Sequence, residues 1–268
     1  MKKVLIGFLA LTLVMSFSMA YATPLVYTNG RPVTIGATSD PVGDPRCAPY
    51  GNCELQTLLP MFNVVTDQQV AGYWQLGGIN PAMDPVVSFE ITANDSTFQT
   101  GIFSVNGSDT TSSRTLVDIF LGPATKGTAA LITFSGGTMT ILGAAGAVNN
   151  GTFSGITPSG FGFYEQPTGD TFTGIGTDTG VTYYSLDQLN GGLAQVLAFR
   201  NPDGSDRWTV AFEDTAIKNA AGGPNGDRDY NDFIFQIESI IPYDVPEPAT
   251  LILLGAGLLG LAVTRRKK

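Results

Sequence analysis

An acidic stretch in the last quarter of the chain carries the side chains best suited to bind a metal ion. Its candidate ligands are Glu213, Asp214, Asp227, Asp229, Asn231 and Asp232. Strand-like runs at 207–212 and 233–241 flank the stretch, and pairing them as a hairpin would bring its two ends together. Like charges about 4 Å apart repel by about 4 kcal/mol at an effective dielectric near 20, and a hard cation with oxygen ligands relieves that repulsion. We therefore predict that calcium is the cofactor of this loop.

Two other interpretations use the same residues. Asp227, Asp229 and Asn231 imitate the start of an EF-hand loop, but Asp232 occupies the sixth position, where that loop needs glycine. Glu238 falls at the twelfth position, yet an extended strand would place it about 20 Å from Asp232. The remaining alternative is that these Asp and Asn side chains only form Asx-turns in a solvated loop.

Composition and charge exclude several classes of function. Residues 23–244 hold 8 basic and 22 acidic side chains, a net charge of −14, so this region should repel nucleic acid and anionic lipid. The 268-residue chain has no histidine, which excludes Ser-His-Asp and Cys-His catalysis and all His-based metal sites. We expect no nucleic-acid partner and no enzymatic activity.

The N-terminus indicates export. Residues 1–22 place Lys2 and Lys3 before an apolar run that ends in Ala20-Tyr21-Ala22, the order of a signal peptide that signal peptidase removes. The alternative is an uncleaved membrane anchor. An even pair of cysteines in an exported chain favours a disulfide between Cys47 and Cys53, with two free thiols as the alternative.

Short segments with period-two alternation predict an all-β fold. The expected strands are 87–91, 98–105, 114–121, 129–134, 138–142, 160–165, 181–185, 194–199, 207–212 and 233–241. Residues 23–52 are expected to be an irregular lead-in, 53–59 a short helix capped by Asn52, and 143–160 a loop or a weak edge. We predict an antiparallel β-sandwich over residues 53–241, for which a jelly roll is one arrangement.

Aromatic and acidic side chains of the predicted sheets suggest two further hypotheses. Trp74, Trp208, Tyr183 and Tyr184 could form a sugar-stacking platform, although such aromatics more often belong to the core. Glu90, Glu165 and Asp187 could supply a pair of glycosidase carboxylates, although no surrounding sequence motif marks them as catalytic.

The C-terminal residues 242–268 form a separate tail. An apolar run at 249–264 would rise about 24 Å as a helix, a little less than a hydrocarbon core of about 30 Å, and basic residues at 265–268 follow it. Those basic residues favour a cytoplasmic C-terminus and an external body. Pro246-Glu247-Pro248, the apolar run and the basic end resemble the PEP-CTERM sorting tail of Gram-negative bacteria that produce exopolysaccharide. The resemblance implies a protein held briefly in the inner membrane, from which an exosortase-type protease removes the tail. A permanent anchor is the alternative.

The body resembles a second family. Phe161-Gly162-Phe163-Tyr164, Ala211-Phe212-Glu213-Asp214 and Asp227-Arg228-Asp229-Tyr230-Asn231-Asp232 follow in the order of the exported domain of unknown function numbered 4114. Members often carry a histidine in the strand that matches residues 194–199, where this chain has Gln195 or its neighbours. The resemblance names no activity.

These observations predict an exported protein of the cell surface, outer membrane or extracellular matrix, with a structural or adhesive role. A module that binds exopolysaccharide is the alternative, and a polysaccharide hydrolase is a third hypothesis.

Overall fold

The computed structural model describes residues 33–36, 54–69, 72–77, 86–94, 97–105, 114–122, 124–169, 181–203, 205–213 and 228–243. The predicted signal peptide, both cysteines and the sorting tail lie outside these ranges, so the disulfide stays a prediction. No helix in the described ranges is long and apolar enough to cross a membrane.

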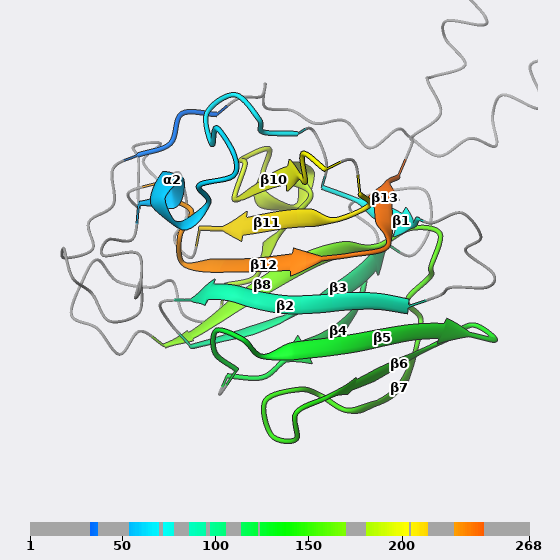
Figure 1. The fold of residues 1–268 in the computed structure, drawn as a ribbon. Helices are drawn as coiled ribbons and strands as arrows, with labels where there is room; N and C mark the ends of the chain where they lie inside the picture. Colours follow the sequence, from blue (N-terminus) through cyan, green and yellow to red (C-terminus); the bar gives the residue numbers. More distant parts are fainter. Residues whose placement is uncertain are drawn as a thin grey trace, which may run out of the picture.

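Antiparallel strands form nearly all of the regular structure, in three sheets (Figure 1). The seven-stranded sheet runs in the order β10 (Val196–Arg200), β11 (Trp208–Phe212), β12 (Phe233–Ile237), β2 (Val86–Asn94), β5 (Ala129–Ser135), β6 (Thr138–Gly143) and β7 (Gly151–Ser154). The four-stranded sheet runs β4 (Arg114–Phe120), β3 (Thr97–Val105), β8 (Gly162–Gly169) and β9 (Tyr183–Tyr184). A two-stranded sheet pairs β1 (Trp74–Leu76) with β13 (Ile240–Pro242). The helices within the described ranges are α2 (Leu55–Leu58) and the 3-10 turn η2 (Asp187–Asn190).

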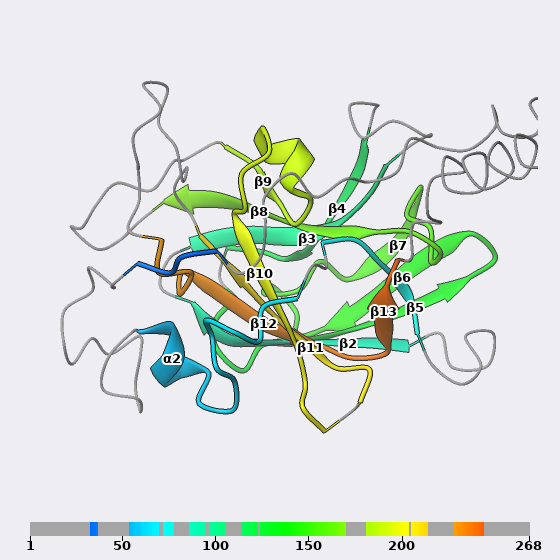
Figure 2. The ribbon, with the colours of Figure 1, turned by 90° about the horizontal axis from the view of Figure 1, so that it is seen from above.

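The main core lies between the two larger sheets, which form two layers in Figure 2. Aromatic contacts cross between the layers: Phe98 of β3 meets Phe233 of β12 at 5.4 Å between ring centroids, and Phe163 of β8 meets Phe235 at 5.2 Å. These contacts follow from period-two alternation, because every second side chain of a strand faces the same layer. The predicted all-β class and antiparallel pairing are confirmed, and the facing sheets agree with a sandwich. The jelly-roll arrangement stays a prediction.

A second apolar cluster covers the outer face of β10, β11 and β12. Leu55, Leu58 and Phe62, from α2 and the segment that follows it, pack with Ala211 and Ile234 of the sheet. Figures 1 and 2 place α2 beside this end of the sheet. Strand β11 is therefore buried on both faces. The outer cover matters for the candidate site, because Tyr230, just before β12, is packed within it.

Three expectations need correction. Residues 233–241 are not one strand: β12 ends at Ile237, the chain turns at Ser239 with a φ of +65°, and β13 joins another sheet. The short predicted helix exists, but Glu54 occupies its N-terminal cap instead of Asn52. Strand β1 was not predicted. Residues 143–160 do contain a weak edge, since the four-residue β7 ends the large sheet.

Candidate metal centre

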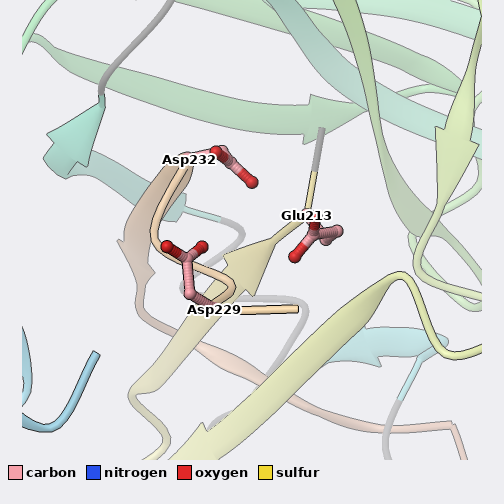
Figure 3. A group of neighbouring side chains, drawn as sticks. All are labelled: Glu213, Asp229 and Asp232. Atoms are coloured by element: carbon pink, nitrogen blue, oxygen red, sulfur yellow. The ribbon is translucent and has the colours of Figure 1, made fainter. Parts of the chain in front are cut away.

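The candidate metal centre lies where β11 ends and β12 begins. These strands pair with each other as predicted, and Phe212 lies opposite Phe233, so Glu213 and Asp232 leave the sheet side by side. Carboxylate oxygens of Glu213, Asp229 and Asp232 all lie within 4.8 Å of one another. Figure 3 shows the three side chains pointing toward one another from the end of β11 and the loop before β12. The end of β11 and the residues just before β12 thus supply one cluster of oxygens.

Burial makes this cluster unlike a solvated acidic loop. Only 1% of Glu213 and 2% of Asp229 are exposed, so water screens their charges poorly. The Tyr230 backbone N–H donates to Glu213 Oε2 at 3.4 Å, and Asn231 Nδ2 donates to Asp229 Oδ2 at 2.8 Å. These bonds orient two of the carboxylates and offset part of the cost of burying them.

The loop that carries Asp229 has an unusual backbone held by the core. Arg228 and Tyr230 both have positive φ, +63° and +55°, a conformation that residues other than glycine rarely adopt. Tyr230 is buried in the outer apolar cluster, and its hydroxyl donates to the Ala194 carbonyl oxygen at 2.6 Å. The Gly36 N–H donates to the Arg228 carbonyl oxygen at 2.8 Å. Packing and these hydrogen bonds therefore hold a strained loop in place.

The structure brings together three of the six predicted ligands, Glu213, Asp229 and Asp232. Asn231 lies beside them, with its amide nitrogen directed at Asp229. Asp214 and Asp227 lie outside the described residues. Glu238, the twelfth position of the rejected EF-hand alignment, lies past the far end of β12, where its carboxylate pairs with Arg207 at 2.5 Å.

Sequence reasoning missed the residues that support this cluster. Gln195 Nε2 donates to the Glu213 carbonyl oxygen at 3.2 Å, and Tyr230 fixes the loop from within the core. Neither role has a local sequence signal, because both depend on the packing of distant segments.

The donor set suits a hard cation. Three carboxylates supply oxygen only, which calcium and magnesium prefer, and zinc sites ordinarily include a sulfur or nitrogen donor. Calcium takes six to eight oxygens, so backbone carbonyls, further side chains or water would complete its shell. The residues present therefore fit a calcium ion held between the two ends of the hairpin.

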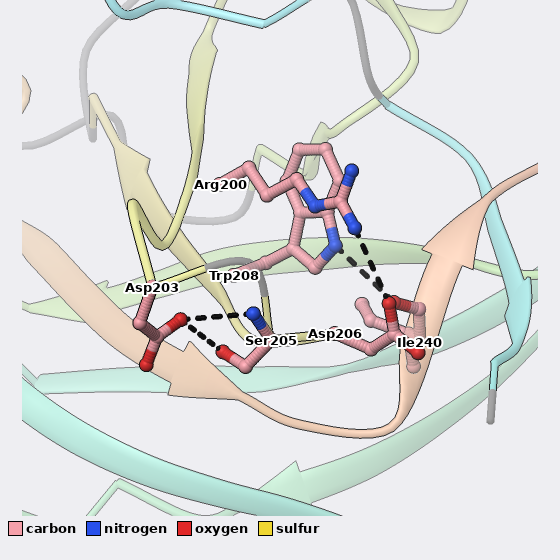
Figure 4. Close-up of polar contacts among 6 residues, drawn as sticks. All are labelled: Arg200, Asp203, Ser205, Asp206, Trp208 and Ile240. Carbon is pink, nitrogen blue, oxygen red and sulfur yellow. Dashed lines mark hydrogen bonds and ion pairs between the residues drawn. The ribbon is translucent and has the colours of Figure 1, made fainter.

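The four aromatic residues considered for sugar stacking are all buried. Trp74 and Trp208 belong to the main core, and the Trp208 indole N–H donates to the Ile240 carbonyl oxygen at 3.2 Å (Figure 4). The aromatic rings therefore form no surface on which a sugar could stack.

The turn before β11 is held by a separate set of polar contacts. Asp203 accepts hydrogen bonds from the hydroxyl and the backbone N–H of Ser205, and these bonds lower the pKa of its carboxyl group.

The carboxylates considered for glycoside hydrolysis do not line an open site either. Glu90 is exposed on β2 of the large sheet, whereas Glu165 on β8 and Asp187 in η2 are fully buried. Neither buried group faces a surface that a polysaccharide chain could reach.

Comparison with known proteins assigns only the tail. Residues 244–267 match the PEP-CTERM protein-sorting motif. No curated protein and no solved structure matches the chain. The resemblance of the body to the domain of unknown function 4114 has no support from these comparisons. The matched motif identifies an exported protein of a Gram-negative bacterium that is sorted and processed by exosortase.

Proposed function

We propose that this chain is a non-enzymatic protein of the bacterial surface or extracellular matrix, with a structural or adhesive role and a body stabilised by calcium. The observation that supports the calcium part is the group of three carboxylates whose oxygens lie within 4.8 Å of one another. At that separation each like-charge pair costs on the order of 3 kcal/mol at an effective dielectric of about 20. A bound divalent cation turns this repulsion into attraction and joins the two ends of the hairpin.

Calcium binding should appear as thermal stabilisation of the full-length protein. If calcium binds only the folded state, a concentration of about 100 times the dissociation constant adds about 2.7 kcal/mol. For a body of this size, that corresponds to a melting temperature higher by about 5 to 10 °C. We expect this shift in circular-dichroism melts in excess calcium relative to melts in chelator.

Magnesium at the same concentration is the matched ionic control. It demands near-ideal octahedral geometry and dehydrates reluctantly, so its shift should be smaller. Equal melting temperatures in calcium and chelator would mean that the loop is held by hydrogen bonds and packing alone.

Export and sorting predict two processing sites. Signal peptidase should leave an N-terminus near Thr23, and exosortase should leave a C-terminus close to Pro246-Glu247-Pro248. Mass spectrometry of the protein from its native host measures both ends at once. Recovery of residues 265–268 on most of the exported protein would contradict removal of the tail and support a permanent anchor.

A further inference from the structure

The outward side of β5, β6 and β7 is an uncharged surface, which we term the neutral face. Its side chains, in cross-strand rows, are Leu131 and Leu142; Thr133, Thr140 and Thr152; and Ser135, Thr138 and Ser154. Most of them are exposed, and the hydroxyl oxygens of Thr140 and Thr152 lie 3.2 Å apart. The chain from residue 127 to residue 164 contains no Asp, Glu, Lys or Arg. Such a surface contrasts with the rest of a body whose net charge is strongly negative.

Strand β7 ends the sheet at the border of this face. Within the described ranges it pairs with β6 alone, so the backbone groups along its outer side form a free edge. Phe153 packs against the main core and holds β7 in place, while Thr152 and Ser154 point outward and are exposed. A free edge is a template for another strand, and proteins blunt it with charge, with proline or by keeping the edge strand very short. Residues 151–154 carry no charge and no proline, and the short length of β7 is their one protective feature.

The charge distribution of the body indicates which kind of strand pairs with the free edge of β7. Two copies of an acidic body repel each other at most orientations, because residues 23–244 carry a net charge of −14. Approach along β7 brings the uncharged segments 127–164 of the two copies together, so the repulsion is smaller there than where acidic segments meet. An isologous contact also needs a surface that is complementary to itself, and an antiparallel edge meets that requirement.

We propose that β7 is a self-association edge, at which two copies join their large sheets into one continuous antiparallel sheet. With a two-fold axis perpendicular to the sheet, directly opposite residues lie on the same face. Thr152 then faces either Thr152 or Ser154 of the second copy. The proposal does not depend on calcium binding, whose ligands lie at the other end of the strand order, between β11 and β12.

Disulfide trapping tests the edge directly in the full-length protein. Opposite residues in an antiparallel pair have Cα atoms about 4.5 to 5.5 Å apart, within the range that a disulfide spans. The double variant Thr152→Cys/Ser154→Cys covers both registers. Under mild oxidation, we expect a dimer whose linking peptides join the substituted positions of two copies, identified by mass spectrometry.

The matched control is Leu131→Cys/Thr133→Cys, which has the same spacing on the same face but lies on β5, two strands from the edge. This control should give no dimer. Equal cross-linking of both variants would mean that the neutral faces stack on each other, and would overturn the edge proposal.

A second variant covers the case in which the cysteines disturb folding. Thr152→Lys places a charge on an exposed edge position and should weaken association by roughly tenfold or more in sedimentation velocity, with an unchanged melting curve. The proposal is wrong if the parent protein stays monomeric at all concentrations, or if Thr152→Lys associates as tightly as the parent. A parent protein that stays monomeric and binds exopolysaccharide through the neutral face would likewise show that the self-association proposal is wrong.

Discussion

Replacing Trp74 with alanine should lower the free energy of unfolding by about 3 to 5 kcal/mol, the usual cost of removing a buried tryptophan. The Trp74 side chain is 0% exposed. Its ring packs against Phe163 at 4.7 Å and Trp208 at 6.3 Å between ring centroids. The same residue belongs to β1, which pairs with β13. Its loss should therefore leave a cavity in the main core and also loosen the last strand.

Urea denaturation monitored by circular dichroism measures this loss. Met61→Ala is the matched control, because Met61 is large and apolar but 54% exposed, and it should change the unfolding free energy by no more than about 0.5 kcal/mol. A Trp74→Ala protein as stable as the Met61→Ala control would place the tryptophan at the surface. That result would reopen the sugar-stacking hypothesis.

Neutralising Glu213 should have opposite effects in chelator and in calcium. Glu213→Gln keeps an oxygen that can accept the Tyr230 N–H bond, but it removes one of the three clustered charges. Without calcium, the loss of like-charge repulsion should raise stability by on the order of 1 to 3 kcal/mol. In excess calcium, the loss of a charged ligand should make the variant less stable than the parent. We expect the order of melting temperatures to reverse between the two conditions.

Glu90→Gln is the control for this reversal, since it makes the same chemical change at an exposed carboxylate on β2. It should shift the melting temperature equally, and slightly, in chelator and calcium. A Glu213→Gln variant that loses the same stability in both conditions would show that the carboxylate serves hydrogen bonding, and that no cation depends on it.

Sequence alone predicted the parts of this fold that rest on local patterns. The alternation of Trp208, Val210 and Phe212 predicted a strand with a core-facing side, and these three side chains are buried there. The pairing of 207–212 with 233–241 predicted which acidic residues meet, because the register of a hairpin follows from the segments it joins.

The parts that sequence could not predict depend on distant contacts. Strand β1 has three residues and no periodicity of its own, and it exists because β13 pairs with it. The turn at Ser239 places a residue other than glycine at positive φ, so the sequence has no glycine there that would predict a turn. The burial of Glu213 and Asp229 also lacks a local signal, since it requires segments more than 100 residues earlier to cover the sheet. That burial separates a candidate ion site from an ordinary acidic loop.

The end of β13 limits how far the body can stand from the sorting motif. Tyr243 is fixed to the body: its N–H donates to the Tyr73 carbonyl oxygen at 2.9 Å, and its ring meets the Tyr73 ring edge-on at 5.6 Å. The sorting motif begins at the next residue, and only Asp244 and Val245 lie between Tyr243 and Pro246. Even in a fully extended chain, the Cα atoms of Tyr243 and Pro246 are no more than about 11 Å apart. Exosortase must therefore reach Pro246 close to the folded body, at the end where β1 and β13 lie and away from the end that carries α2 (Figure 1). The space available to the protease at Pro246 is thus set by the position at which β13 leaves the folded body.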